Sequence, residues 1–315
     1  MKYLRTGCRT RVNIPFLAPS WSRFDKLTNV NHTSAARRKP PVAGAVDAAS
    51  RVAAVTVAFW VIKVLSTAMG EATSDLFVHT IGPVPGVALG FILFAVTIVL
   101  HFTARRFSTA RYWAAIVGVS VFGTMVADVA HVGFGIPYLV SALICAVVLA
   151  AIFVVWHRTE GTISIHSITT RRREVFYWLA VLVTFALGTA VGDLTATTFG
   201  LGYFLSGVIF AVAIAIPAVA FRITRMLPVA MFWTAYVLTR PLGASFADWF
   251  GVDKQRGGLD FGSGLVAIIL TVAIVIMVAA TATARAPRRA HAADRKRANR
   301  TTGTSAATTK KVDAV

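Results

Sequence analysis

A motif of fixed spacing recurs four times and constrains the fold more than any other feature of this chain. In each copy an aromatic residue precedes a Trp, a Gly lies ten residues after the Trp, and an Asp lies fifteen residues after it. Four copies at one internal spacing indicate internal duplication, which sets the architecture of the whole chain. The copies are Phe59-Trp60…Gly70…Asp75, Tyr112-Trp113…Gly123…Asp128, Tyr177-Trp178…Gly188…Asp193 and Phe232-Trp233…Gly243…Asp248.

The sequence around the motifs is too apolar for a soluble domain. Hydrophobic residues make up 56% of the chain and charged residues 14%, and the mean hydropathy is +0.69. Runs of about 20 apolar residues are typical of membrane-spanning helices. We therefore predict an all-α polytopic membrane protein with eight transmembrane helices. The predicted helices span about 53–77, 84–102, 111–130, 136–156, 175–196, 201–221, 228–249 and 261–284.

The predicted helices pair into four two-helix repeats, each a hairpin closed by a short turn. All four repeats run in the same direction because each crosses the membrane twice. They cover about 53–102, 111–156, 175–221 and 228–284. The chain then divides into a transmembrane domain, residues 52–284, and two basic tails, residues 1–51 and 285–315. We expect both tails to be disordered because they lack hydrophobic periodicity.

The distribution of positive charge predicts the orientation in the membrane. The N-terminal tail has ten Lys and Arg against two Asp, and the C-terminal tail has nine against two. The loops between repeats carry nine Arg, whereas the turns within repeats carry only Lys254 and Arg256. Because cytoplasmic loops are rich in Lys and Arg, we predict a multi-pass protein of the plasma (inner) membrane with both termini in the cytoplasm and no signal peptide. The tails are expected to contact anionic lipid; without a recognition motif, nucleic-acid binding is not expected.

An Asp within each apolar run is the strongest functional signal, because a carboxylate in a membrane is energetically expensive. At 1.5 Å per residue each Asp lies about 22 Å along its helix from the Trp, so parallel repeats put all four at one depth. Glu71, four residues before Asp75, adds a fifth carboxyl to the same helix face. We predict that five residues form an ion or proton site: Glu71, Asp75, Asp128, Asp193 and Asp248.

Other polar residues on the same helices accompany the carboxyls. Two are basic, Lys63 and Arg240, so five carboxyls face two cations and three positive charges are missing. Protons, bound cations or water must then compensate the remaining negative charge. Thr124 and Thr189 directly follow the motif Gly and either support a ligand or bond back to their own helix.

Each feature also has a purely structural interpretation. An intramembrane Asp can be a protonated residue that joins helices, and the motif Gly permits close helix packing. We expect the four Trp to be interfacial anchors and the stretch Arg171–Glu174 to be a topology signal in contact with lipid. Pro241 is the best candidate for local unwinding, because it removes an internal hydrogen bond. His79 and His131, near the outer turns, are either a metal pair or exposed loop histidines.

Three stretches of the chain resemble a known family: Thr162–Trp178, its continuation Leu179–Asp193, and Leu238–Ser245. They are similar to a family of bacterial integral membrane proteins with four tandem two-helix repeats, each marked by a Trp. Members are often labelled as membrane-anchored proteins predicted to regulate amylopullulanase. The resemblance covers about residues 52–284. It supports the architecture and implies no mechanism, and no residue in these stretches suggests carbohydrate handling.

We therefore expect a transporter or channel for a small cation, either a divalent metal such as Mn²⁺ or an ion moved with proton coupling. Carboxylate oxygens without Cys ligands suit hard cations. Lys63 and Arg240 would tune the ion affinity or replace the ion in the empty state. The alternative is a non-transporting membrane interaction or regulatory protein, whose carboxyls form packing hydrogen bonds. We expect no enzyme and no resident cofactor, because the spans contain no Ser/His pair, His-rich metal motif or nucleotide loop.

Overall fold

The fold was analysed in a computed structural model, which describes residues 51–104, 107–224 and 228–283. Every regular element in these ranges is helical and none is a strand, so the predicted all-α class is confirmed. The two basic tails, apart from Arg51, lie outside the described residues, and so do Arg105, Arg106 and Arg225 of the predicted basic loops.

Eight long helices follow one another along the chain, as predicted. They are α2 (Val57–Ile81), α3 (Pro83–Phe102), α4 (Thr109–Asp128), α5 (Tyr138–Glu160), α6 (Arg171–Asp193), α7 (Gly202–Thr224), α8 (Pro228–Gly251) and a final helix, Ser263–Thr283. Two π-helical turns, η1 (Val129–Gly133) and η3 (Leu194–Thr198), extend α4 and α6, and two 3₁₀ turns, η2 (Ile165–Ser167) and η4 (Lys254–Arg256), lie in connections.

Capping residues explain why the first helix begins later than predicted. The side chain of Thr56 accepts a hydrogen bond from the N–H of Phe59 at 3.2 Å, which satisfies a free donor of the first turn and starts α2 at Val57. At the other end Gly82 has φ +88°, a conformation that favours glycine, and Pro83 begins α3 directly after it.

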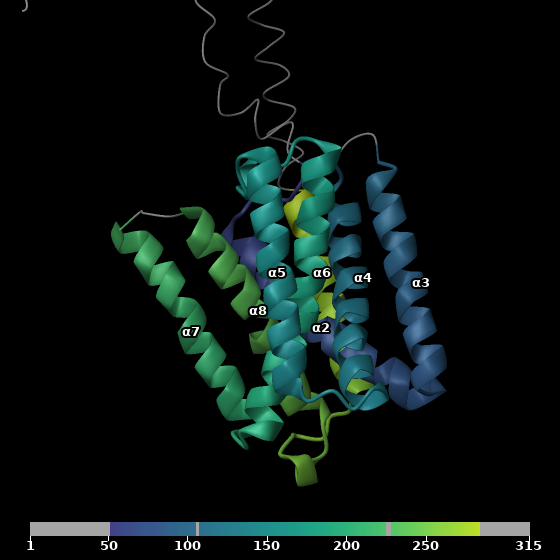
Figure 1. Ribbon diagram of the computed structural model, residues 1–315. Helices are drawn as coiled ribbons and strands as arrows, with labels where there is room; N and C mark the ends of the chain where they lie inside the picture. The colour runs from purple at the N-terminus through teal and green to yellow at the C-terminus, as the bar shows by residue number, and fades with distance from the viewer. Residues whose placement is uncertain (1–50, 105–106, 225–227, 284–315) are drawn as a thin grey trace, which may run out of the picture. The chain divides into compact units, whose positions relative to one another are not determined.

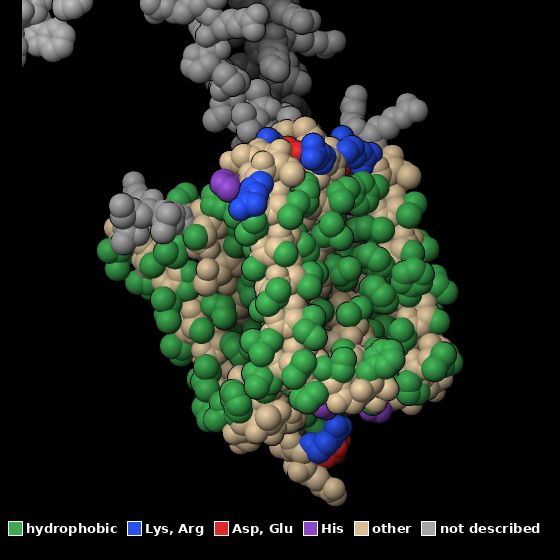
Figure 2. Space-filling view, viewed as in Figure 1, with side chains coloured by type: hydrophobic (Ala, Val, Ile, Leu, Met, Phe, Trp, Pro, Cys, Tyr) green, Lys and Arg blue, Asp and Glu red, His purple; other side chains and the backbone are tan. Residues whose placement is uncertain are grey.

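Six of the eight helices in the described ranges are long and apolar enough to cross a membrane. Only α2 and α8 fall outside this set. They are less hydrophobic because they carry charged residues: Lys63, Glu71 and Asp75 in α2, and Arg240 and Asp248 in α8. Figure 2 shows hydrophobic side chains along the length of the helices, with Lys and Arg at their two ends, most of them near the connection between α5 and α6. The chain therefore has the surface of a membrane-embedded protein.

The four motif helices form a closed ring. Along this ring α2 contacts α4, α4 contacts α6, α6 contacts α8, and α8 returns to α2. In Figure 1, α4 and α6 lie between α3 and α7, which are at the two flanks. The membrane-length segments containing α4 and α6 are 56% and 67% buried inside the protein, against 11–22% for the other four candidate spans. We call α2, α4, α6 and α8 the inner helices, and the remaining four the outer helices.

Each outer helix packs against the inner helix of the next repeat. Thus α3 contacts α4, α5 contacts α6, and α7 contacts α8. The final helix closes the cycle by packing Val266 and Ala267 against Ala72 of α2. The predicted hairpins are therefore only part of the arrangement, because the larger interface of an outer helix lies with the following repeat. This exchange links the four repeats into one body.

The aromatic residue before each motif Trp repeats the same cyclic contact. Its ring packs against the Trp of the following repeat, with centroids 5.6–6.2 Å apart. The pairs are Phe59 with Trp113, Tyr112 with Trp178, Tyr177 with Trp233, and Phe232 with Trp60. Three of the four Trp are buried, at 3–5% exposure. The interpretation as interfacial anchors is wrong for those three, because they fill the seams between inner helices.

The motif glycines also lie against the inner helix of the following repeat. We number positions from the motif Trp, so that the Gly is at +10. A Cβ on each of these glycines would overlap the side chain at +7 of the next repeat. The facing pairs are Gly70 with Ser120, Gly123 with Phe185, Gly188 with Arg240, and Gly243 with Thr67. Close helix packing is therefore the role of the motif Gly, as the structural interpretation predicted.

Candidate functional site

Arg240 occupies the middle of the ring. It lies at position +7 of α8, and its side chain is fully buried. One guanidinium nitrogen donates to the Glu71 carboxylate at 2.5 Å, to the Thr189 hydroxyl at 2.7 Å and to the Thr124 hydroxyl. The other terminal nitrogen donates to the backbone carbonyl of Thr67 at 2.9 Å. One side chain of the fourth repeat thus binds groups from the other three.

The three oxygen-bearing partners occupy one equivalent position. Glu71, Thr124 and Thr189 all lie at +11, and the fourth repeat has Ala244 there. The small Ala244 side chain leaves the centre free for Arg240, which reaches it from one turn earlier on the same helix. Gly188 lies against the Cβ and Cγ atoms of Arg240, and because it has no side chain it leaves room for the aliphatic part of Arg240. The sequence prediction named all four polar members, and the structure brings them into direct contact.

The Glu71–Arg240 pair is a buried, charge-assisted interaction. The side chains of Glu71 and Arg240 are 5% and 0% exposed. At such a site the attraction between opposite charges is strong, but the desolvation cost is also high, so each charge depends on the other. The Thr124 hydroxyl bonds back to the Ser120 carbonyl of its own helix at 3.0 Å and also lies 3.4 Å from the same carboxylate. Any ligand that takes Glu71 must therefore compete with Arg240.

The four motif Asp follow one turn beyond this cluster, at +15. Asp248 is buried and the other three are half-buried. Glu71 interacts electrostatically with all four, and Asp248 also interacts with the other three Asp. The structure therefore brings the five predicted carboxyls into one region: Glu71, Asp75, Asp128, Asp193 and Asp248. In the described part of the chain, no three His, Cys, Asp or Glu are positioned to hold a metal ion together.

The helix geometry changes immediately after two of these Asp. Asp128 is the last residue of α4 and Asp193 the last of α6, and each is followed by a π-helical turn, η1 or η3. Single π turns widen a helix locally and occur frequently at functional sites. Across the seam between repeats one and two, the Ser74 hydroxyl donates to Asp128 at 3.5 Å. Asp128 and Asp193 thus lie at helix ends where the backbone is irregular.

Lys63 lies on the other side of Arg240, at position +3 of α2. It is fully buried, and its Nζ has no hydrogen-bond partner among the described residues. The ammonium instead faces the rings of Phe185 and Tyr236, at 3.9 and 4.2 Å from their centroids. Cation–π contacts of this kind stabilise a desolvated ammonium only in part. The structure separates Lys63 from Glu71 and the Asp, so Lys63 is not part of the Arg240 cluster.

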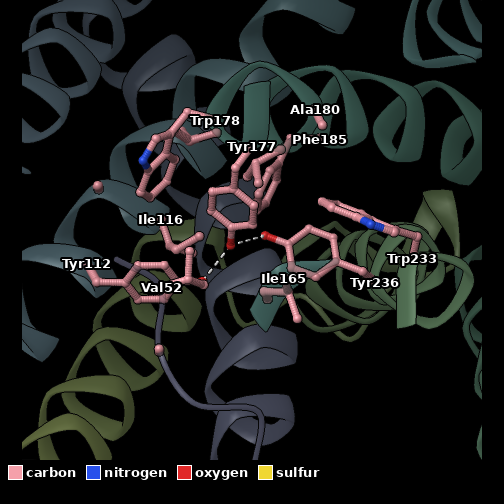
Figure 3. Packing of buried hydrophobic residues seen from close by; sticks show 14 of the residues in the cluster. Val52, Tyr112, Ile116, Ile165, Tyr177, Trp178, Ala180, Phe185, Trp233 and Tyr236 are labelled. Atoms are coloured by element: carbon pink, nitrogen blue, oxygen red, sulfur yellow. Dashed lines mark hydrogen bonds between the residues drawn. The ribbon is translucent and has the colours of Figure 1, made fainter. Parts of the chain in front are cut away.

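Three tyrosines that the sequence analysis did not assign to the site join their hydroxyls in the centre of the ring. Tyr112 and Tyr177 are 2.6 Å apart at their oxygens, and Tyr177 and Tyr236 are 3.4 Å apart. Figure 3 shows the three hydroxyls pointing toward one another from α4, α6 and α8. Tyr112 and Tyr177 lie at −1 and Tyr236 at +3. The positions −1, +3, +7, +11 and +15 are four residues apart, about one helical turn, and their side chains follow one another along the ring axis. This four-residue spacing was the sequence signal that could have placed the tyrosines in the ring.

The opposite end of the ring has another buried carboxylate, Glu174. It binds Arg51 at 3.1 Å, Arg171 at 3.2 Å and His101 at 3.0 Å, and is 1% exposed. The interpretation of this stretch as a lipid-contacting topology signal is wrong for Glu174, because it is enclosed by basic groups from three segments. Two of these partners lie 73 and 123 residues away in the sequence, so no local pattern revealed them.

The remaining candidates do not join the site. His79 bonds to the carbonyl of Asp75 in its own helix at 2.7 Å, and His131 stacks on Tyr138 at 3.6 Å. The two histidines therefore have separate local partners rather than a shared ligand. Pro241 lies within α8, which continues to Gly251 without unwinding.

Comparison with known proteins identifies the repeats. The family model described as a Repeat of Unknown Function (DUF347) matches four consecutive stretches of the chain, residues 58–107, 111–162, 176–226 and 231–286. No curated protein and no solved structure matches the chain. The matched stretches agree with the four repeats delimited by the motif spacing.

Proposed function

The chain belongs to the DUF347 repeat family, and from this premise we propose that its four repeats form a membrane carrier for a small, hard cation. All eight helices would cross the plasma (inner) membrane. The outer helices would face lipid, and both termini would lie in the cytoplasm. The charged helices α2 and α8 fit this arrangement because they belong to the inner ring. Anionic lipid would contact the basic tails.

The single observation that carries the proposal is the position of the Arg240 guanidinium. It binds one carboxylate and two hydroxyls contributed by three repeats. Carboxylate and hydroxyl oxygens are also ligands of hard cations such as Mn²⁺, Mg²⁺ and Ca²⁺. In the empty state Arg240 therefore substitutes for the transported ion. An arriving cation would compete for Glu71, with Thr124 and Thr189 as further ligands.

The Asp at +15 would attract and receive the cation. Four carboxyls gathered around one axis create a negative potential, which raises the local concentration of cations. Their position one turn from Glu71 would let an ion pass from the Asp to the central site. This step would require the Asp side chains to rearrange, since the described carboxyls are not positioned as a three-ligand set. Binding would thus be coupled to a change in the ring, as in a carrier.

Ion flux in proteoliposomes tests the proposal. Purified protein would be reconstituted, and uptake of Mn²⁺, Mg²⁺ and Ca²⁺ measured separately for the wild type, for Glu71→Gln and for each motif Asp changed to Asn. The proposal predicts uptake of at least one cation and its loss in Glu71→Gln. Asp253→Asn is the matched control, because Asp253 is an exposed carboxylate outside the ring. Absence of uptake, or equal uptake in all these variants, would overturn the proposal.

The second candidate is a non-transporting membrane protein with a regulatory or interaction role. The observation that favours it is the direct pairing of Arg240 with Glu71, Thr124 and Thr189, which would also serve as packing bonds between repeats. In that case Glu71→Gln would lower the stability of the protein, and no cation gradient would respond. The flux assay therefore separates the two candidates.

A further inference from the structure

The environment of Lys63 is unusual for a charged side chain. Its Nζ is fully enclosed and has no hydrogen-bond partner in the described part of the chain. The faces of two aromatic rings, Phe185 and Tyr236, lie at 3.9 and 4.2 Å. An ammonium normally donates three hydrogen bonds, and burying it without them is costly. The surroundings of Nζ therefore stabilise its positive charge only weakly.

The charges around Lys63 are few. Arg240 from α8 interacts with it electrostatically and also lies over the Phe185 ring, 5.3 Å from its centroid. The other titratable group in contact with Lys63 is Tyr236 of α8, whose hydroxyl bonds to Tyr177 of α6, which in turn bonds to Tyr112 of α4. Along α2, the next charged group is Glu71, two turns away and bound to Arg240. Glu71 is the carboxylate bonded to Arg240 in the described part of the chain, whereas Asp75, Asp128 and Asp193 interact with it without a bond.

We propose that Lys63 is a proton-binding site whose occupancy is coupled to the cation site through Arg240. The inference rests on the proposed function and adds protons as the exchanged ion. When a cation takes Glu71, the guanidinium of Arg240 loses its bonded counter-charge, and its repulsion of the Lys63 ammonium increases. Two like charges in a buried site disfavour each other, and only the ammonium can lose its charge, since Arg stays protonated.

In the exchange, one N–H bond of the Lys63 ammonium breaks, the electron pair stays on Nζ, and the proton leaves to water. A divalent cation brings two positive charges. One replaces the charge that the ammonium gives up, and the other is compensated by a motif carboxylate beside the bound ion. Return of a proton to Lys63 restores the repulsion toward Arg240 and favours its return to Glu71, which expels the cation. The coupling is reciprocal, as any linkage between two binding sites must be.

Proton release on Mn²⁺ binding tests this coupling directly. Detergent-purified full-length protein would be titrated with Mn²⁺ in buffers of different ionisation enthalpy, which gives the number of protons released per bound ion. We expect Lys63→Met to bind Mn²⁺ but to release about one proton fewer than the wild type. Protons from the carboxyls contribute equally in both proteins, so the difference isolates Lys63. Ile116→Met is the matched control, because Ile116 holds the equivalent +3 position in α4 without a titratable group.

A second variant separates charge from structure. Lys63→Arg keeps a permanent charge beside Arg240, and we expect it to weaken Mn²⁺ binding by about tenfold or more. Lys63→Met removes a buried ammonium without hydrogen bonds and is expected to fold, as checked by gel filtration and thermal unfolding. Equal proton release in wild type and Lys63→Met would overturn the coupling and leave cation transport intact. A wild type that neither binds nor transports a cation would overturn the proposed function and this inference together.

Discussion

The guanidinium of Arg240 lies 2.5 Å from the carboxylate of Glu71, across a ring built from four repeats. The two residues are 169 positions apart in the chain, and both are buried. The pair breaks the fourfold symmetry, since one repeat contributes a cation where another contributes an anion. It therefore defines a specific centre in an otherwise repetitive fold.

Removing Arg240 is expected to be more damaging than removing both members of the pair. Arg240→Met leaves Glu71 buried without its counter-charge and should lower the free energy of unfolding by about 3–5 kcal/mol. Arg240→Met combined with Glu71→Gln should recover most of that loss. Unfolding in detergent, followed for both single variants and the double variant, measures the coupling. Strictly additive effects would show that the two side chains do not depend on each other.

The motif glycines are expected to be intolerant of even one methyl group. Gly188→Ala would drive a Cβ into the stem of Arg240 and should destabilise the protein by about 1–3 kcal/mol through overpacking. Gly192, one turn further along α6, is the internal control, because its nearest neighbours would lie 3.7–3.9 Å from an added Cβ. Thermal unfolding of the two variants checks this contrast. If Gly192→Ala lost as much stability as Gly188→Ala, the close contact with Arg240 would not be the cause.

The tyrosine hydroxyls should contribute unequally. Tyr177 bonds to both Tyr112 and Tyr236, so Tyr177→Phe removes both contacts and should cost about 1–3 kcal/mol. Tyr112→Phe removes only one contact and should cost less. The free energies of unfolding of the two variants provide the measurement. The reverse order would contradict the central position assigned to Tyr177.

Cysteine labelling tests the eight-span arrangement. After replacing Cys8 and Cys145 by Ser, a single Cys would be introduced at Arg158, at the end of α5, or at Lys254, after α8; both residues are exposed. Eight crossings with cytoplasmic termini predict that a membrane-impermeant maleimide added to intact cells labels Lys254→Cys and not Arg158→Cys. Permeabilised cells, in which both should react, provide the control. Labelling of both positions in intact cells would contradict the proposed topology.

Local regularity explains what the sequence could predict. The ten- and fifteen-residue spacings give each Gly and each Asp the same position on its inner helix relative to the motif Trp. Helix geometry therefore predicted that the four Asp carboxyls lie in one region. Lys63, Arg240, Thr124 and Thr189 were identifiable because polar residues are conspicuous in apolar runs. Eight helices followed from the alternation of apolar runs and breaks.

Contacts between distant repeats could not be derived in the same way. The order of the helices along the chain is the same whether an outer helix packs mainly on the inner helix of its own repeat or on that of the following repeat. The sequence therefore did not show which of the two arrangements the protein adopts. Burial of Trp113, Trp178 and Trp233 depends on that packing, whereas Trp near a helix start is usually an interfacial signal. Glu174 was misinterpreted because its partners His101 and Arg51 come from other segments.

We propose that side-chain oxygens from several repeats bind one cation in the middle of the ring. A crystal of the protein grown with Mn²⁺ would show the position of the metal through its anomalous difference density. We expect one peak between Glu71 and the motif Asp, with Arg240 displaced from the carboxylate. An Mn²⁺ peak only outside the ring, or no peak at saturating Mn²⁺ with Arg240 still bound to Glu71, would contradict it.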